Sequence, residues 1–165
     1  MRVIGGEFRR RLLKSVPGLD TRPTPDRLRE TLFNILASRI DGTVFADLYA
    51  GTGAVGIEAL SRGARRAIFV ESNRAAVNVI RENLKSLGIE NRADVREARA
   101  KSVQADIVFV DPPYHLERAY EVALANIQAP LIILQHDVRL KFPNATRMVK
   151  QGDNCLSFFE TATIE

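Results

Sequence analysis

The spacing of apolar residues changes several times along this chain, and the changes predict a mixed α/β fold. Short apolar runs of the kind that form buried strands occupy residues 44–47, 67–71, 93–96, 105–110 and 130–135. Apolar residues with helical spacing occupy residues 24–40, 54–62, 73–87 and 116–127. Strands and helices that alternate in this way indicate a parallel sheet with helices on both faces.

Both ends of the chain depart from this alternation. Residues 145–160 contain two strand-like runs joined by the turn-forming letters QGDN, which predicts an antiparallel hairpin at the edge of the sheet. Residues 1–17 combine β-forming residues with glycines and a proline, which predicts a short hairpin followed by a loop. We therefore expect an N-terminal hairpin extension over residues 1–23 and a single domain with a doubly wound, mostly parallel seven-stranded sheet over residues 24–165.

The first predicted helix has a recognisable start. The hydroxyl of Thr24 can cap the helix, and Pro25 suits the first helical position. The carboxylate of Asp26 suits the positive end of the helix dipole. Thr24 is therefore a candidate cap of this helix.

Length and composition exclude several classes of protein. A chain of 165 residues is long enough for one domain with a substantial core and too short for two. Its apolar runs are far below the roughly 20 residues that cross a bilayer, and the N-terminus lacks a signal-peptide core, so we expect a soluble, cytoplasmic protein. The single cysteine, Cys155, excludes an internal disulfide, and two histidines give no cluster with metal-ligand spacing. We expect a buried thiol at Cys155 and no bound metal.

Positive charge is concentrated in the first quarter of the chain. The formal net charge is +4, but residues 1–40 alone carry nine Arg or Lys residues against four acids. A basic segment on an otherwise near-neutral domain is typical of proteins that contact nucleic-acid phosphates. A solvated basic surface without a partner is the alternative that charge alone leaves open.

A glycine-rich motif joins the first predicted strand to the helix that follows. Gly51, Gly53 and Gly56 form a GxGxxG pattern, in which the turn lets a ligand approach the backbone closely. Glu71 lies 20 residues after Gly51, at the end of the next strand, where a carboxylate can accept both hydroxyls of a ribose. The combination favours a nucleoside-type ligand over a purely structural turn.

The residues before the glycines distinguish between nucleoside-type ligands. In a dinucleotide-binding fold the first glycine usually follows the strand directly, so that the helix N-terminus faces a pyrophosphate. Here Asp47 ends the strand and three further residues precede Gly51. A carboxylate at this position would repel a pyrophosphate but could orient an ammonium group, which S-adenosylmethionine carries on its methionine part. The sequence therefore favours S-adenosylmethionine over a nicotinamide cofactor.

The second motif is DPPY at residues 111–114, which follows a strand-like apolar run. Two consecutive prolines remove two backbone N–H donors and confine the residues before them to extended conformations, so the strand must end in a rigid corner. Taken alone, the corner is also compatible with an ordinary turn at the end of a strand.

The order of these motifs, DxxxGxGxxG, then Glu71, then DPPY, resembles that of the class I methyltransferases that modify planar amino groups. The resemblance implies a Rossmann-like fold and a corner that receives the target amine beside the methyl group of the cofactor. It implies that the Asp111 carboxylate and the Pro112 carbonyl accept hydrogen bonds from the two N–H groups of the amine. These acceptors would pull the nitrogen towards a pyramidal geometry and stabilise the positive charge that develops on attack. Tyr114 can stack on the base and fix its approach.

Further blocks are similar to one branch of this class, the RsmD-type small-subunit ribosomal RNA methyltransferases, which methylate a guanine at N2. The blocks cover nearly the whole chain and are IGGEFRRRLL, TRPTPDRLRETLFNIL, DLYAGTGAVGIEALSRGA, FVESNRAAV, VFVDPPY and MVKQGDNCLSFFE. The second block is far more specific to this family than the glycine motif is. The resemblance implies a methyltransferase domain over residues 24–165 that methylates a guanine N2 in 16S ribosomal RNA.

The resemblance also assigns contacts with S-adenosylmethionine. They fall in the loop after the first strand and at the ribose and adenine edge, on Asp47, Ala50, Gly51, Gly53, Glu71 and Ser72. The family usually has an Asp-Ala pair after the third strand that meets the adenine, whereas this chain has Glu97 and Ala98. The longer side chain of Glu97 can shift that contact.

Contacts with RNA follow from the basic extension. The family's basic N-terminal hairpin is held to engage ribosomal RNA, in agreement with the charge of residues 1–40. The best phosphate-binding candidates are Arg9, Arg10 and Arg11. The resemblance also places Arg22 and Thr24 near the cofactor and target pocket. Where this chain has Gln135 the family commonly has an acid, and the sequence assigns Gln135 no function.

The substrate is less constrained than the cofactor. The same corner serves adenine N6 and cytosine N4 in nucleic acids, and an Asn-Pro-Pro-Tyr variant serves glutamine side chains. Asp111 and the basic N-terminus favour a nucleic acid, and only the family blocks favour guanine N2. A target base must leave its helix to reach the corner, at a cost of a few kcal/mol, which unpaired bases in ribosomal RNA lower.

Two other functions fit the sequence. A DNA amino-methyltransferase would share the core but usually needs a recognition domain, which 165 residues barely accommodate. A non-catalytic RNA-binding ribosome-assembly factor would keep the basic hairpin beside a relic cofactor pocket. We expect instead a monomeric enzyme that acts on 16S ribosomal RNA or on the small ribosomal subunit particle, without a membrane or a metal.

Overall fold

Alternate residues of the central strands face two separate hydrophobic layers. The computed structural model describes residues 1–18, 24–100, 102–113 and 115–161. In the fourth strand, Ile107 and Phe109 face one layer, and Val108 and Val110 face the other. A strand that is buried on both faces has a continuous apolar sequence, which is why the predicted strands lack a polar face.

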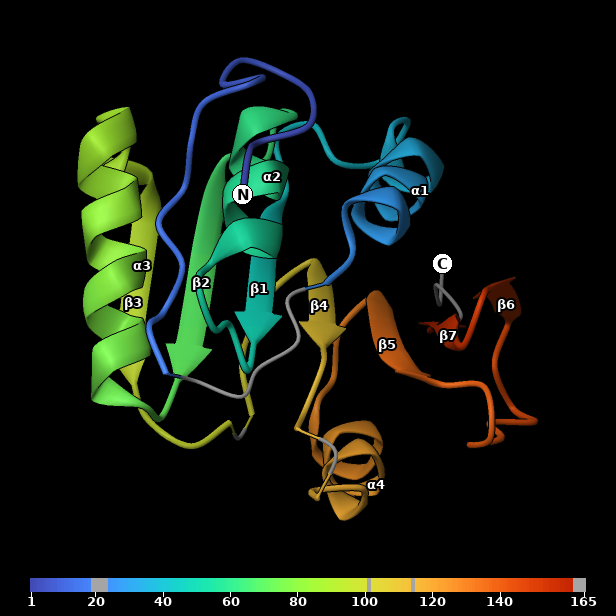
Figure 1. The fold of residues 1–165 in the computed structure, drawn as a ribbon. Coiled ribbons are helices and arrows are strands. Elements are labelled where there is room, and N and C mark those ends of the chain that lie inside the picture. The colour runs from blue at the N-terminus through green and yellow to red at the C-terminus, as the bar shows by residue number, and fades with distance from the viewer. Residues whose placement is uncertain (19–23, 101, 114, 162–165) are drawn as a thin grey trace.

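Within the described residues, the strands form one seven-stranded sheet in the order β3-β2-β1-β4-β5-β7-β6 (Figure 1). The strands are β1 (Val44–Leu48), β2 (Arg66–Glu71), β3 (Ala93–Glu97), β4 (Ile107–Val110), β5 (Leu131–Asp137), β6 (Arg147–Gln151) and β7 (Asn154–Glu160). Strands β1 to β5 are parallel, and β7 is antiparallel to both β5 and β6. The mostly parallel sheet with a C-terminal edge hairpin confirms the predicted fold class.

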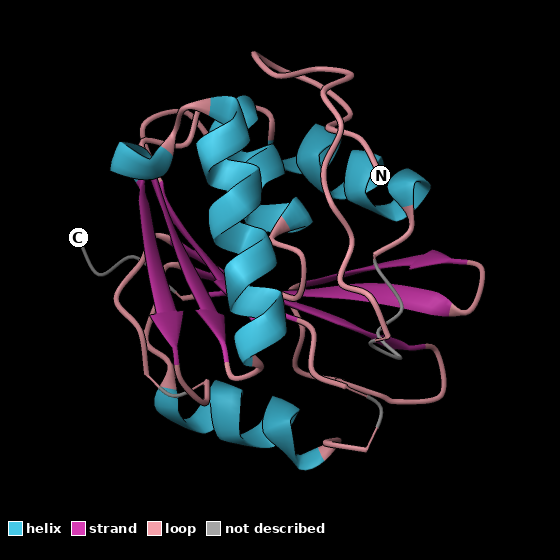
Figure 2. Cartoon of the chain, turned by 60° about the vertical axis from the view of Figure 1, so that its left-hand side comes forward, coloured by secondary structure: helices cyan, strands magenta, loops and turns pink. Residues whose placement is uncertain are grey.

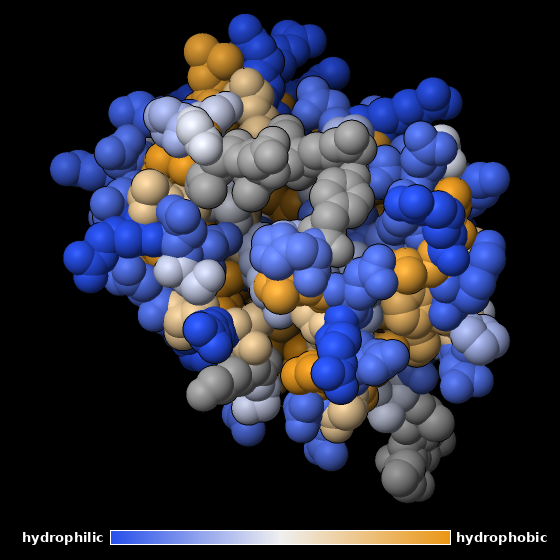
Figure 3. All heavy atoms as spheres, turned by 60° about the horizontal axis from the view of Figure 1, so that its bottom comes forward, coloured by the Kyte–Doolittle hydropathy of each residue, from blue (hydrophilic) through white to orange (hydrophobic). Residues whose placement is uncertain are grey.

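Helices cover both faces of this sheet (Figure 2). The helices are α1 (Asp26–Leu36), α2 (Ala54–Ser61), α3 (Arg74–Leu87) and α4 (Arg118–Asn126), and a short 3-10 turn, η1 (Glu90–Arg92), precedes β3. Helices α1, α2 and α3 pack on one face, and α4 packs on the other. The carboxyl ends of the parallel strands all lie at one end of the molecule, which Figure 3 shows with apolar side chains visible between hydrophilic ones.

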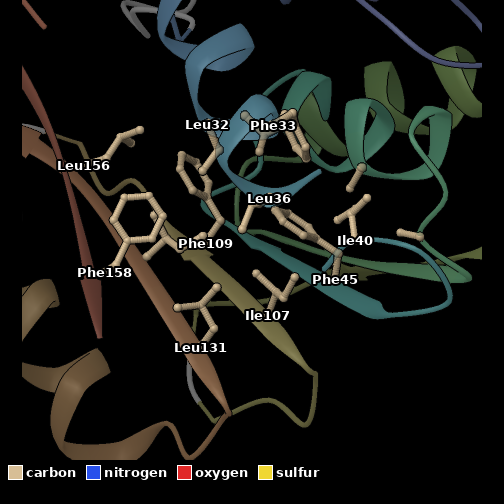
Figure 4. Packing of buried hydrophobic residues seen from close by; sticks show 14 of the residues in the cluster. Leu32, Phe33, Leu36, Ile40, Phe45, Ile107, Phe109, Leu131, Leu156 and Phe158 are labelled. Carbon is tan, nitrogen blue, oxygen red and sulfur yellow. The ribbon is translucent and has the colours of Figure 1, made fainter. Parts of the chain in front are cut away.

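The core beneath α1 is built largely from leucine and phenylalanine. Leu32 and Phe33 of α1 are fully buried and pack towards Phe45 and Phe109 of the neighbouring strands β1 and β4 (Figure 4). The rings of Phe33 and Phe45 lie 5.8 Å apart between centroids. Burial of each such side chain stabilises the fold by about 1.5–3 kcal/mol.

The predicted cap of α1 is wrong. The residue before the helix is Pro25, and no side chain caps the first turn. The hydroxyl of Thr24 instead donates a hydrogen bond of 3.2 Å to Oε1 of Gln135 on β5. Thr24 therefore fastens the start of α1 to the end of a distant strand, a tertiary contact that local sequence does not reveal.

The N-terminal extension folds back on itself, in a minimal form of the predicted hairpin. Arg2 and Leu12 form an antiparallel bridge, and the backbone N–H of Val3 donates to the carbonyl of Arg11 at 3.0 Å. The side chains of Val3 and Leu13 are buried against α2 and α3. The extension is thus packed onto the domain by apolar contacts.

A buried carboxylate, Glu58 of α2, also holds the extension. Its two oxygens accept hydrogen bonds of 2.9 Å from the backbone N–H groups of residues 4–5. Arg62 donates to it at 2.9 Å, and the fully buried guanidinium of Arg29 lies 3.7 Å away. Arg29 in turn donates to the carbonyl of Arg2 at 2.6 Å. The charges of two helices therefore meet at the backbone of the extension.

Other expectations from composition can be compared with the described part of the chain. Cys155 is buried there, as predicted, with 2% of its surface exposed. No helix in the described ranges is both long and apolar enough to cross a membrane. No group of three or more side chains in those ranges is placed to hold a metal ion.

Replacing Glu58 by alanine should destabilise the protein by about 3–5 kcal/mol, because the buried Arg29 cation loses its counter-ion and two backbone N–H groups lose their acceptor. Urea unfolding followed by circular dichroism measures the change. The matched control is Glu82→Ala, which removes an exposed carboxylate 3.0 Å from Lys14 and should cost at most about 1 kcal/mol. Equal effects of the two substitutions would contradict an anchoring role for Glu58.

Candidate active site

Acidic side chains gather at the carboxyl ends of neighbouring parallel strands. Asp47 lies near the end of β1, Glu71 ends β2, and Asp111 directly follows β4. Asp47 is level with Phe109 in the β1–β4 pairing, so Asp111 lies two residues further along the adjacent strand, on the same face. The structure therefore brings together three of the acids that the sequence singled out.

The glycine turn after β1 uses left-handed backbone conformations. Gly51 has a φ of 57°, and Tyr49, which is not a glycine, has a φ of 60°. A Cβ added to Gly51 would meet open space, whereas one on Gly56 would come within 2.4 Å of Cε1 of Phe69. Gly51 thus leaves room beside the backbone for a ligand, and Gly56 allows α2 to pack closely on β2.

Asp47 connects β1 to α2. Its side chain is buried, and its Oδ2 accepts a hydrogen bond of 2.9 Å from the backbone N–H of Gly56. Burial raises the pKa of Asp47 well above its ordinary value, the Gly56 hydrogen bond opposes the rise, and the charges of Asp111 and Glu71 add to it. A cation placed beside this carboxyl would relieve the cost of ionising it.

Glu71 holds the glycine turn in place. Its two carboxylate oxygens accept hydrogen bonds of 2.9 Å from the backbone N–H groups of Gly51 and Asn73. Each carboxylate oxygen has a second lone pair, so Glu71 can still accept the hydroxyls of a ribose. Glu71, which the spacing predicted to contact a ribose, thus also stabilises the conformation of the turn.

Asp111 lies in a poorly solvated position. Removal of water by the surrounding protein raises the pKa of Asp111 to about 7. Its carboxylate accepts no hydrogen bond within the described residues, and the next residue, Pro112, is buried. Tyr114, which was predicted to stack on the base, lies outside the described residues.

The predicted adenine edge is exposed. Ser72, Glu97 and Ala98 all lie at the surface, and the backbone N–H of Ala98 donates to the carbonyl of Glu71 at 3.0 Å. Glu97 forms an ion pair of 3.1 Å with Arg74 of α3. This pair directs the carboxylate of Glu97 towards α3, and its predicted contact with adenine stays a prediction.

A cavity of about 450 Å³ opens on the opposite face of β1. It lies between the loop after β3, represented by Ala100, and helix α4, represented by Val122 and Ala123. Tyr49, from the glycine turn, forms part of its wall. The cavity therefore adjoins the turn that Glu71 holds.

The arginines of the extension lie at the other end of the molecule. Arg9, Arg10 and Arg11 are exposed, and their hairpin lies at the end of the sheet opposite the carboxyl ends of the strands (Figure 1). The guanidinium of Arg11 donates to the carbonyl of Ser86 at 3.1 Å, which ties it to the end of α3. Arg22 lies outside the described residues.

Sequence reasoning missed Asn83, which connects the extension to the glycine turn. The side chain of Asn83 is 2% exposed and exchanges two hydrogen bonds with the backbone of Lys14, of 2.7 and 3.1 Å. It also donates to the carbonyl of Thr52 at 3.1 Å. A signal was present, because Asn83 lies on the apolar face of α3 beside Leu84, where an unpaired polar side chain would be costly.

The sheet order, the glycine turn held by an acid of the next strand, and the acid-proline corner after β4 define a class I methyltransferase. Residues 1–159 match the model of the family described as Conserved hypothetical protein 95. The chain belongs to this family, that of the RsmD-type methyltransferases, and the resemblance inferred from the sequence is confirmed.

Individual relatives agree with this assignment. The chain is 36% identical over 159 residues to YlbH of Bacillus subtilis, covering 87% of this chain and 86% of YlbH. It is 44% identical over 120 residues to Ribosomal RNA small subunit methyltransferase D of Escherichia coli, covering 69% of this chain and 60% of that protein. Its fold matches the solved structure of yhhF from Escherichia coli with a TM-score of 0.81 at 36% identity, covering 97% of both chains.

Asp111→Asn should stabilise the protein, and the gain should grow with pH. The folded state raises the pKa of Asp111 from 3.8 to about 7, so wild-type stability falls as the pH rises from about 4 through 7. The variant stays neutral and should gain roughly 1–4 kcal/mol at pH 8 and little at pH 4. Urea unfolding at several pH values measures the difference. Asp153→Asn, at an exposed position of the β6–β7 turn, is the control, and a gain independent of pH would contradict the proposed desolvation of Asp111.

Proposed function

We propose that this protein transfers a methyl group from S-adenosylmethionine to N2 of a guanine in 16S ribosomal RNA. In this proposal residues 24–165 form the methyltransferase domain, and residues 1–23 form an RNA-binding extension. The observation that carries it is the position of Asp111, a carboxyl with a pKa raised to about 7, beside Asp47 and the glycine turn. A ribosomal RNA substrate would place the protein in the cytoplasm.

The residues around the glycine turn fit S-adenosylmethionine. Asp47 would bind the ammonium group of its methionine part, Gly51 gives space for the ligand, and Glu71 keeps lone pairs for the ribose hydroxyls. Ala50 and Gly53 complete the loop, and the cavity beside Tyr49, which has both apolar residues and the polar Ser102 and Asn126 in its wall, suits an adenine ring with its polar edge. S-adenosylmethionine supplies an electrophilic methyl group on a sulfonium.

Asp111 and Pro112 would act on the amine that receives this methyl. The carboxylate of Asp111 and the carbonyl of Pro112 would accept hydrogen bonds from the two N–H groups of the amine. These hydrogen bonds would hold the nitrogen lone pair towards the methyl group. As the N–C bond forms and the S–C bond breaks, the nitrogen becomes positive and must lose a proton. A carboxylate with a pKa of about 7 is suited to take that proton and pass it to solvent. Tyr114 would stack on the base.

The basic extension supports an RNA substrate of considerable size. The hairpin that carries its arginines lies at the end of the sheet opposite the carboxyl ends of the parallel strands (Figure 1), and Asp111 directly follows β4 at those carboxyl ends. A strand of the length of β5 (Leu131–Asp137) spans roughly 20 Å. An RNA that contacts both ends must be at least this long. Folded ribosomal RNA and a ribosomal particle are both large enough.

The function can be tested by methyl transfer to small ribosomal subunits from a strain that lacks this gene. Radiolabelled S-adenosylmethionine and nucleoside analysis should give labelled N2-methylguanosine. Asp111→Asn should lower kcat by about 100–1000-fold, because an acceptor for the developing charge is lost. For the wild type, kcat/KM should rise with pH through about 7 and then level off, since the ionised carboxylate is the active form.

The controls separate the alternatives. Asp153→Asn, in the exposed turn of the edge hairpin, should show the wild-type rate and pH profile. Another labelled base would identify a different amino-methyltransferase. No label with the wild type would favour a non-catalytic assembly factor, and a fully active Asp111→Asn variant would exclude the proposed role of the carboxylate.

Replacing Arg9, Arg10 and Arg11 together by alanine should weaken binding to small-subunit RNA and flatten its salt dependence. Loss of about three phosphate contacts should reduce the slope of log K against log salt by about 2–3. Filter binding between 50 and 200 mM salt measures this. A control replaces Arg147 and Lys150 of the edge strand β6, and an equal loss per removed charge in the two variants would show that only net charge matters.

A further inference from the structure

The register of β4 and β5 places Gln135 beside the acid-proline corner. Val110 pairs with Leu134, so the residues that follow, Asp111 and Gln135, are neighbours on adjacent parallel strands. Ile133 faces the layer beneath α1, and Gln135 comes two residues later, so its side chain points to this same face. The contact between Gln135 and Thr24, just before α1, agrees with this orientation.

The side chain of Gln135 is held in place but has an unused donor. Gln135 is 6% exposed, and its Oε1 accepts the hydroxyl of Thr24 at 3.2 Å. From the other face of the sheet, the hydroxyl of Tyr120 donates to the Gln135 carbonyl at 2.6 Å. Within the described residues Nε2 makes no hydrogen bond. It is also not completely buried, so a molecule from solvent can reach it. An amide donor on a nearly buried side chain, with no partner among the described residues, is available to hydrogen-bond a ligand.

We propose that Gln135 reads the Watson–Crick edge of the target guanine, an inference that rests on the function proposed above. With the guanine N2 amine at Asp111, the next groups along the edge of the base are N1–H and O6. The Gln135 amide offers an acceptor and a donor that match them: Oε1 accepts N1–H with its second lone pair, and Nε2 donates to O6.

The same arrangement would reject the other amino-bearing bases. Adenine held by its N6 amine presents an unprotonated N1 as the next group, and cytosine held by its N4 amine presents an unprotonated N3. Either ring nitrogen would face Oε1, and two acceptors cannot share a hydrogen bond. With the Thr24 hydroxyl donating to Oε1, as in this structure, Oε1 is the acceptor end of the amide and Nε2 is its unused donor end. Gln135 would therefore select guanine at a corner whose chemistry serves all three bases.

The test compares Gln135→Met with Gln135→Glu in the subunit methylation assay. Methionine keeps the size of the side chain and removes both polar atoms, so kcat should fall about 10–100-fold. Glutamate keeps an acceptor for N1–H but places its second oxygen against O6, so with all three proteins assayed at pH 8.5, where a carboxyl is ionised, its kcat should lie between those of Gln135→Met and the wild type. The KM for subunits and the affinity for S-adenosylmethionine should change less than twofold in both variants, because the base is read only after it has left its helix.

A matched control is available in the edge hairpin. Gln151 of β6 also forms a side-chain hydrogen bond with a threonine, donating to Oγ1 of Thr31 at 3.1 Å. Gln151→Met should leave kcat unchanged. A merely structural role of Gln135 would lower the melting temperature and the cofactor affinity in Gln135→Met, and Gln135→Glu would not rescue kcat.

The result that overturns the proposal is distinct from a failure of the proposed function. If the wild type forms N2-methylguanosine and Gln135→Met forms it at the same rate, Gln135 does not read the base. Equal losses in the methionine and glutamate variants would also exclude the proposed contacts. Absence of N2-methylguanosine with the wild type would instead contradict the function proposed above.

Discussion

The parallel register of β1, β4 and β5 is the constraint on which the arrangement of the site depends. In this register Asp47 is level with Phe109, and Val110 is level with Leu134. Polar residues at the ends of three strands that are neighbours in the sheet therefore face the same side, the face on which α1 and α2 pack. A slip of one residue in any pairing would turn these side chains to the opposite face, where α4 packs. The large hydrophobic layers on both faces resist such a slip, because every strand would exchange its two sets of apolar side chains.

The same register imposes an electrostatic cost. Asp47 and Asp111 are both poorly solvated, and the charge of Asp111 raises the pKa of Asp47 further. The hydrogen bond from Gly56 offsets only part of this cost. A protein selected for stability alone would not place two carboxyls there. A site that receives an ammonium group at one carboxyl and an amine at the other gains from both, and the phenylalanine-rich core stabilises the fold enough to tolerate the pair.

Features decided by residues close together in the sequence were predictable. Continuous apolar runs identified the parallel strands, and the glycine spacing identified the turn after β1. The acid at Glu71 was also found, since a fixed number of residues separates it from the turn. The sequence predicted this residue as a ribose contact, whereas the structure adds that it accepts the backbone N–H of Gly51. A sequence pattern identifies the end of a strand, but the hydrogen-bond partners of the residue at that end depend on the fold.

Contacts between distant residues were not predictable. Thr24 and Gln135 are separated by 111 positions, and local preference alone assigned Thr24 to a helix cap. Glu58 is a similar case, because a glutamate in a helix is normally a surface residue. Helix α2 is buried along all eight of its residues, and Glu58 accepts hydrogen bonds there both from Arg62, one turn further along, and from the backbone of residues 4–5, more than 50 positions away. Buried polar residues of this kind acquire their partners only when the whole topology forms.

These long-range contacts also bear on how the basic extension could contribute to methylation. The extension is fixed to α2 through Glu58 and to α3 through Asn83, and Asn83 also holds the carbonyl of Thr52 in the glycine turn. Its arginines are therefore positioned relative to the cofactor loop by buried hydrogen bonds. An RNA bound to such a rigid surface would present its bases to the far end of the sheet at a nearly fixed distance. Phosphate contacts on the extension would then set which part of the RNA reaches the corner, and polar groups at the strand ends would decide which base reacts there.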